Sequence, residues 1–291
     1  MLIGTLKQLF KNRVCQTKTD GRISDDPVPF QDVLPARSIP TLDRIASFLF
    51  PAFWDVDDRE SFSEKVKELS KAMPHGFHAS DNFITWGRNN SMFDDHAFVK
   101  AWESNIESPS DKGIVWRRYI LATSAFHCVQ LDGDFVECGA YTGVGVKTVM
   151  DYLGGSRFPK QFWAYDVFEH QVGMENLPMP DVGAELFQRV KRKFSEYPQV
   201  KIIKGLIPAS FEGNCPDRIA YLHIDLNQAP AEIAAFEHLF DRVVPGGMII
   251  LDDYEWSGIY RPQKLAEDEW LDRRGYRVIP LPTGQGILVK R

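Results

Sequence analysis

The stretch Phe-Val-Glu-Cys-Gly-Ala-Tyr-Thr-Gly-Val-Gly at residues 135–145 decides the fold. Its first four residues are typical of a short buried strand. The glycines that follow permit a tight turn and the close approach of a ligand before a helix begins. The turn departs from the G-x-G-x-x-G pattern of dinucleotide-binding proteins, because Tyr141 stands where the middle glycine is expected. The stretch therefore predicts the first strand, turn and helix of an open α/β sheet.

Short apolar segments follow at intervals that leave room for a helix between them. They are residues 162–165, 200–203, 221–224 and 248–251. Strands that alternate with helices predict a doubly wound, mostly parallel sheet. Residues 276–279 and 286–289 are two further strand candidates joined by a short loop, and they predict a C-terminal antiparallel hairpin. This Rossmann-like order is typical of class I methyltransferases.

The part of the chain before this sheet has a different composition. Residues 1–40 include a polar, proline-containing stretch, which is typical of a linker. Residues 41–112 predict a helical cap, because apolar residues recur at helical spacing in 42–49 and again in 62–73. A helix over about residues 114–129 then opens the predicted methyltransferase domain, residues 113–291.

Composition excludes several classes of function. The 291 residues are 44% hydrophobic and carry a formal net charge of −6, so a nucleic-acid or anionic-membrane surface is not expected. The four cysteines are scattered, which favours neither a zinc site nor a disulfide framework. No run approaches the ~20 apolar residues of a membrane helix. We expect a cytoplasmic protein with a small-molecule substrate, and a homodimer is one arrangement that we consider.

The predicted turn favours S-adenosylmethionine over a dinucleotide. This cofactor has no phosphate, and its positively charged groups suit an acidic neighbour such as Glu137. Asp166 ends the second strand, where an acid can accept hydrogen bonds from both ribose hydroxyls. The predicted cofactor-binding residues are Glu137, Gly139, Ala140, Tyr141, Gly143, Asp166 and Asp225. The alternative is that Glu137 and Asp166 are acidic helix caps.

Three more aspartates follow neighbouring strands of the predicted sheet. Asp225 ends the fourth strand, and Asp252 and Asp253 end the fifth. Like charges that converge in a partly buried crevice need a cation or protons to neutralise them, and Mg²⁺ prefers oxygen ligands. The alternative is that these aspartates cap the helices that follow. His223 is expected on the same strand face as Asp225, where a lone histidine is usually part of the core.

Several motifs of this sequence resemble the macrocin O-methyltransferase family, which methylates sugar hydroxyls on antibiotics and related compounds. The resemblance spans about residues 80–291. It is carried by residues 81–89, 133–139, 166–169 and, most specifically, by Pro-Gly-Gly-Met-Ile-Ile-Leu-Asp-Asp-Tyr at 245–254.

The resemblance implies a metal-dependent O-methyltransferase. In that case Asp225, Asp252 and Asp253 hold Mg²⁺, two neighbouring substrate hydroxyls complete its coordination, and Asp225 accepts the proton. The sequence departs from the family at Asn227, Ala229 and Pro230, where a second acid, an aromatic residue and a glutamate are usual.

Two rival readings stay open. A catechol-type methyltransferase uses a similar crevice, so the acceptor hydroxyl is either sugar-like or phenolic. A non-catalytic, cofactor-binding scaffold subunit would explain the departures near Asn227, although the retained aspartates argue against it. A nicotinamide dehydrogenase would require glycine in place of Tyr141.

Overall fold

The centre of the chain is a seven-stranded sheet whose inner strands are nearly continuous runs of apolar residues. β7 (Ile219–Ile224) buries all six of its residues, as expected of a parallel strand that is covered on both faces. In sheet order the strands are β6 (Val200–Lys204), β5 (Phe162–Asp166), β4 (Asp134–Cys138), β7, β8 (Val243–Leu251), β10 (Gly286–Val289) and β9 (Ile279–Pro280). The first five are mutually parallel, and β10 runs antiparallel to β8 and to β9. This confirms the predicted fold class.

The structure is a computed structural model, and it describes residues 35, 45–73, 75–170, 174 and 179–291. These residues belong to one compact unit, Val33–Arg291. Apart from Pro35, the segment predicted as residues 1–40 lies outside the described residues. None of the described helices has both the length and the apolar character that a membrane-crossing segment requires.

The strand register brings four strand ends to one edge of the sheet. Cys138 of β4 pairs with Tyr165 of β5 and with Ile224 of β7, and Ile224 pairs in turn with Leu251 of β8. The residues that follow these four therefore emerge side by side. In an open α/β sheet this carboxyl edge is where ligands bind.

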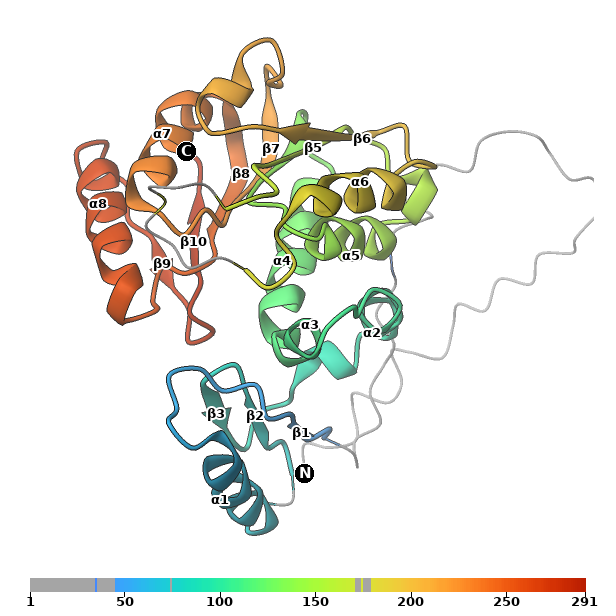
Figure 1. Cartoon of the computed structure of the whole chain (residues 1–291), viewed down its shortest axis with the longest axis vertical. Helices are drawn as coiled ribbons and strands as arrows, with labels where there is room; N and C mark the ends of the chain where they lie inside the picture. The colour runs from blue at the N-terminus through green and yellow to red at the C-terminus, as the bar shows by residue number, and fades with distance from the viewer. Residues whose placement is uncertain (1–34, 36–44, 74, 171–173, 175–178) are drawn as a thin grey trace, which may run out of the picture. The chain divides into compact units, whose positions relative to one another are not determined.

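Helices cover both faces of the sheet (Figure 1). α4 (Val115–Cys128), α5 (Val144–Tyr152) and α6 (Ala184–Lys193) lie on one side, and α7 (Ala229–Leu239) and α8 (Arg261–Asp272) on the other. Alternation along β4 divides the core. Val136 and Cys138 pack toward Phe236 and Trp270, whereas Phe135 meets the ring of Tyr221, 5.0 Å between centroids, on the opposite face.

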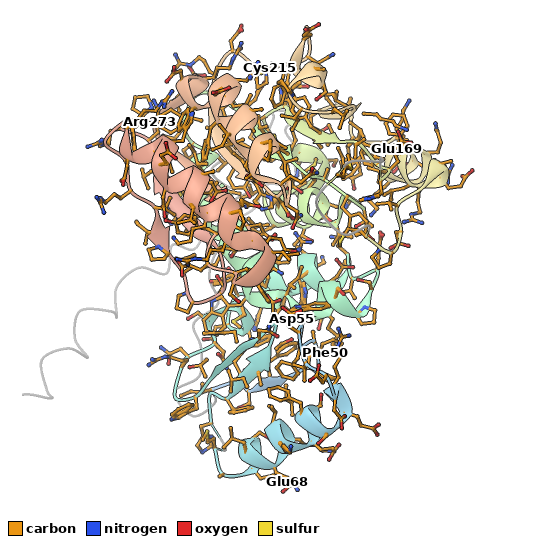
Figure 2. All side chains as sticks on the ribbon, turned by 60° about the vertical axis from the view of Figure 1, so that its left-hand side comes forward. Phe50, Asp55, Glu68, Glu169, Cys215 and Arg273 are labelled. Carbon is orange, nitrogen blue, oxygen red and sulfur yellow. The ribbon has the colours of Figure 1, made fainter. Side chains whose placement is uncertain are left out.

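A small second sheet precedes the large one. It consists of β1 (Phe48–Leu49), β2 (His78–Ser80) and β3 (Phe83–Thr85), with α1 (Arg59–Lys71) packed on it and α2 (His96–Glu103) and α3 (Pro109–Gly113) following. Short 3₁₀ turns occupy Ser91–Phe93, Gly155–Arg157, Ala209–Phe211, Phe240–Arg242 and Gly258–Tyr260. Figure 2 shows Glu68 on the side of α1 that faces away from this sheet.

The predicted helical cap of residues 41–112 is helical only in part, because it also contains three short strands. The helical spacing of residues 62–73 does correspond to α1, which begins where Asp58 accepts a hydrogen bond from the Ser61 N–H at 2.9 Å. The described residues of the 42–49 pattern, in contrast, include strand β1, which pairs in parallel with β2. The ring of Phe48 packs against His78 and Phe93, and Pro51 follows two residues after β1, so tertiary contacts override the apolar spacing.

The C-terminal hairpin is confirmed but shorter than predicted. Residues 276–278 lie before β9, which contains only Ile279 and Pro280. Pro280 has no N–H, so β9 suits the edge position that it holds in the sheet.

Replacing Gly139 by alanine should strongly destabilise the protein. Gly139 has φ +97°, and a Cβ at this position would lie 1.8 Å from the carbonyl oxygen of Asp225, which belongs to the backbone and cannot rotate away. We expect a loss of more than ~4 kcal/mol in the free energy of unfolding. Urea unfolding measures it.

Gly87 provides the matched control for this variant. It also has a positive φ, +61°, but a Cβ there would meet nothing within 4 Å. Gly87→Ala should therefore lose only ~1–2 kcal/mol, the cost of the left-handed conformation alone. Equal losses in the two variants would contradict the close approach of the strand ends.

Candidate functional site

A cavity of about 520 Å³ opens at the carboxyl edge of the sheet. The turn after β4, the end of β5 and the segments after β6 and β7 contribute its walls, which include Gly139, Tyr141, Asp166, Leu206, Ile207, Pro208, Asp225 and Asn227. Its size is within the range of small-molecule sites, and it combines apolar walls with a few carboxylates.

The turn after β4 is held by hydrogen bonds to β5. The N–H groups of Gly139 and Ala140 both donate to the carbonyl oxygen of Tyr165, at 2.8 and 3.1 Å. Tyr141 has φ +45°, a conformation that is uncommon for a residue with a side chain. Its N–H donates to the Asp166 carboxylate at 2.7 Å. The predicted tight turn is present, and Asp166 fixes it.

Asp166 lies at the cavity wall with both oxygens engaged by the backbone. Oδ2 accepts from the Tyr141 N–H and Oδ1 accepts from the Phe168 N–H at 2.5 Å. Burial raises the pKa of Asp166 above its ordinary value, and these N–H groups offset only part of that effect. Each carboxylate oxygen has two lone pairs, so Asp166 can still accept hydrogen bonds from ligand hydroxyls.

The structure brings only part of the predicted cofactor set to the cavity. Gly139, Tyr141, Asp166 and Asp225 line it, whereas Glu137, Ala140 and Gly143 are absent from the described lining. Glu137 is 2% exposed, and its carboxylate lies 3.3 Å from Nδ1 of His223. Strand alternation explains this placement, because Glu137 points to the α4 and α5 face beneath the turn.

The three remaining aspartates do converge near the cavity, as predicted, but they already have protein partners. Oδ2 of Asp252 accepts from Nη1 of Arg117 at 2.6 Å, and Oδ1 of Asp253 lies 3.3 Å from the same nitrogen. Asp225 accepts a hydrogen bond from the Asn227 amide at 3.0 Å. The helix-cap alternative finds no support, since the N-caps of α7 and α8 are Gln228 and Tyr260, and neither makes a side-chain hydrogen bond.

Arg117 is the residue that the sequence did not reveal. It lies on α4 and its Nε and Nη2 donate to the two oxygens of Asp81, at 2.8 and 3.3 Å. Asp81 follows β2 at the tip of the small hairpin, where its Oδ1 also accepts from the indole N–H of Trp54 at 3.0 Å. The only signal in the sequence is a charged residue between the apolar positions of a predicted helix.

Electrostatics divides the aspartates into two kinds. Burial acts to raise the pKa of Asp252, but Arg117 and His223 outweigh it and hold this pKa well below its usual range. Burial and the charge of Asp252 raise the pKa of Asp225 to about 7. Burial and Asp225 raise the pKa of Asp253 well above its usual value.

His223 is a buried ion-pair partner and not a free base. Burial acts to lower its pKa, but Glu137 and Asp252 raise it to about 10, so the imidazole is protonated at neutral pH. Its Nε2 lies 3.4 Å from Oδ1 of Asp252 and its side chain is 1% exposed. This agrees with the expectation that His223 belongs to the core.

The predicted Mg²⁺ ligands Asp225, Asp252 and Asp253 are not three carboxylates without protein partners. Among the described residues, the group with ligand atoms within 4.8 Å of one another is His223, Asp225 and Asp252, without Asp253. Oδ1 of Asp252 also accepts from the Gln285 amide at 2.7 Å. Asp252 therefore faces three protein donors, with which a metal ion at this position would have to compete.

Comparison with known proteins adds independent information. The family model described as macrocin-O-methyltransferase (TylF) matches residues 122–270, just over half of the 291-residue chain. The match includes the turn after β4, Asp166, Asp225, Asp252 and Asp253. Asp81 and Arg117 precede it.

Two individual proteins illustrate the similarity. A Streptomyces olivaceus protein named 8-demethyl-8-(2,3-dimethoxy-alpha-L-rhamnosyl)-tetracenomycin-C 4'-O-methyltransferase is 26% identical over 148 residues, 42% of this chain and 53% of that protein. The chain thus spans about half the length of this curated relative. The solved structure of the O-methyltransferase NovP has a TM-score of 0.53 at 20% identity and covers 60% of this chain and 80% of its own. The likeness to NovP shows a shared fold.

Proposed function

The chain belongs to the macrocin-O-methyltransferase family, and on that premise we propose that it transfers a methyl group from S-adenosylmethionine to a hydroxyl of a sugar unit on a small molecule. The name of the Streptomyces olivaceus relative, which specifies a rhamnosyl 4'-hydroxyl, supports a sugar acceptor over a phenol.

The observation that carries the proposal is the cavity at the carboxyl edge of the sheet. Gly139 has no side chain, so the backbone of the turn itself forms part of the cavity wall. Asp166 offers a carboxylate to ribose hydroxyls. Leu206, Ile207 and Pro208 supply an apolar wall suited to a purine ring. These residues fit S-adenosylmethionine, which when bound supplies a methyl group on a positively charged sulfur.

Asp225 is the residue that we assign as proton acceptor. It lies at the junction of the cavity and the aspartate cluster, and it is half-buried. A hydroxyl oxygen must lose its proton when it forms a new bond to carbon, and a base is most effective when its pKa is near the working pH. With a pKa raised to about 7, Asp225 meets that condition, whereas Asp252 is held ionised by Arg117.

The direct test is transfer of a labelled methyl group. The purified chain would be incubated with methyl-labelled S-adenosylmethionine and either a rhamnoside or a simple catechol, and products would be identified by mass spectrometry. Gain of one labelled methyl on the sugar supports the proposal. Labelling of the catechol alone would assign a phenolic acceptor, and failure to bind the cofactor would reject the proposal.

Removing the charge of Asp166 should weaken cofactor binding. Asp166→Asn keeps the size and one oxygen acceptor for the Tyr141 N–H, but it removes the ionised acceptor for ligand hydroxyls. Loss of a charge-assisted hydrogen bond costs ~1.5–3 kcal/mol, so affinity for S-adenosylhomocysteine should fall by roughly tenfold or more. Calorimetric titration measures it.

Asp132→Asn is the matched control for Asp166→Asn. The Asp132 side chain is 81% exposed and pairs with Arg218, away from the cavity lining. Its affinity should equal that of the unaltered chain. An Asp166→Asn variant that bound the ligand equally well would remove Asp166 from the cofactor site.

The rate should follow the ionisation of Asp225. A carboxyl is a base only when ionised, so kcat/KM should rise as pH increases through about 7 and then level off. Asp225→Asn should lose most of the activity and this rise with it. Initial rates of methyl transfer, measured over a range of pH for both proteins, test this expectation. An unaltered pH profile in Asp225→Asn would assign the proton transfer to another group.

A further inference from the structure

We propose that Arg117 is the resident cation of the aspartate crevice, taking the place that a divalent metal would otherwise hold, so that this chain transfers its methyl group without a metal. The activity part of this inference rests on the proposed function. The binding part, that the crevice does not take up a divalent cation, can be examined on the free protein.

The guanidinium of Arg117 contacts carboxylates on two sides. Nε and Nη2 make a two-pronged contact with Asp81, and Nη1 contacts both Asp252 and Asp253, so three carboxylates share one guanidinium. A planar guanidinium suits such paired carboxylate contacts, and it stays charged at every pH at which a protein is folded. A positive charge is therefore built into the crevice.

Burial makes this cation hard to displace. The Arg117 side chain is 12% exposed, and those of Asp81, Asp252 and Asp253 are 7%, 10% and 10% exposed. Removing one partner from a buried ion pair leaves an uncompensated charge, which costs far more than an exposed pair contributes. The ring of Trp256 covers the guanidinium at 5.6 Å, which further confines it.

A metal ion at Asp252 would compete with three protein donors. Its Oδ2 accepts from Arg117 at 2.6 Å, and its Oδ1 accepts from Gln285 at 2.7 Å and lies 3.4 Å from Nε2 of His223. Mg²⁺ demands near-octahedral oxygen ligation and gives up its waters reluctantly. To bind Mg²⁺ at this position, Asp252 would have to exchange charged protein donors for the ion.

Arg117 and Asp81 reach the aspartates of the large sheet from earlier parts of the chain. Both residues precede residues 122–270, the region that matches the family model. Asp225, Asp252 and Asp253 lie inside that region, whereas the cation that contacts Asp252 and Asp253 is contributed by α4, before it. Asp81 also links Arg117 to the small sheet, which places the cation by contacts from two elements.

The test uses Mn²⁺ as a paramagnetic substitute for Mg²⁺ on the full chain. Electron paramagnetic resonance reports free Mn²⁺, and we expect the unaltered protein to leave that signal undiminished. Arg117→Met removes the resident charge and should create a Mn²⁺ site. This site should be absent from the double variant that carries both Arg117→Met and Asp252→Asn. Arg218→Met is the matched control, because Arg218 pairs with the exposed Asp132 at 3.0 Å, away from the aspartate crevice. It should gain no Mn²⁺ binding.

The activity assay gives a second, separable readout. Methyl transfer should be unchanged in excess chelator and unchanged by added Mg²⁺, it should be lost in Arg117→Met, and Arg117→Lys should restore part of it. Binding of Mn²⁺ by the unaltered chain that is lost in Asp252→Asn would overturn the inference, and so would activity that requires Mg²⁺. If Arg117→Met does not fold, Mn²⁺ titration of the unaltered chain and of Asp252→Asn decides the matter. If no acceptor is methylated, the proposed function fails while the Mn²⁺ result still stands.

Discussion

The close approach of two backbones at Gly139 is the constraint on which the site depends. The N–H of Asp225 donates to the carbonyl of Cys138 at 2.8 Å, and the Asp225 carbonyl lies where the Cβ of any residue other than glycine would be at position 139. This contact ties the ends of β4 and β7 together. It thereby puts the turn that carries Tyr141 and the carboxylate of Asp225 on the wall of one cavity.

Charge neutralisation is the second requirement of this edge of the sheet, and two side chains of the protein contribute to it. Carboxylates that gather in a partly buried place are costly unless cations accompany them. Arg117 and the protonated His223 supply that charge to Asp252, so Asp252 stays ionised and fixed in position. At Asp225 the nearby positive charges do not outweigh the effect of burial, so its pKa is raised and it can exchange a proton near neutral pH.

The limits of the sequence-based prediction have specific physical causes. Glu137 was predicted at the cofactor from its place at a strand end, but alternation along β4 turns it toward His223. The 42–49 pattern was assigned to a helix, yet β1 forms within it because Phe48 packs among aromatic rings from distant segments. The Mg²⁺ site stays a prediction, and it was made from three carboxylates without knowledge that Arg117 lies beside two of them. Each of these interpretations lacked a contact between residues far apart in the chain.

What the sequence by itself determined was the succession of strands along the chain, the turn after residue 138 and the gathering of Asp166, Asp225, Asp252 and Asp253 at one edge. These features follow from local periodicity and from the rule that parallel strands share a carboxyl edge. Only the tertiary structure decided what neutralises the aspartates, because Arg117 lies 135 residues from Asp252 and 36 from Asp81 along the chain. No local pattern records that pairing, since it arises when α4 packs between the small sheet and the large one.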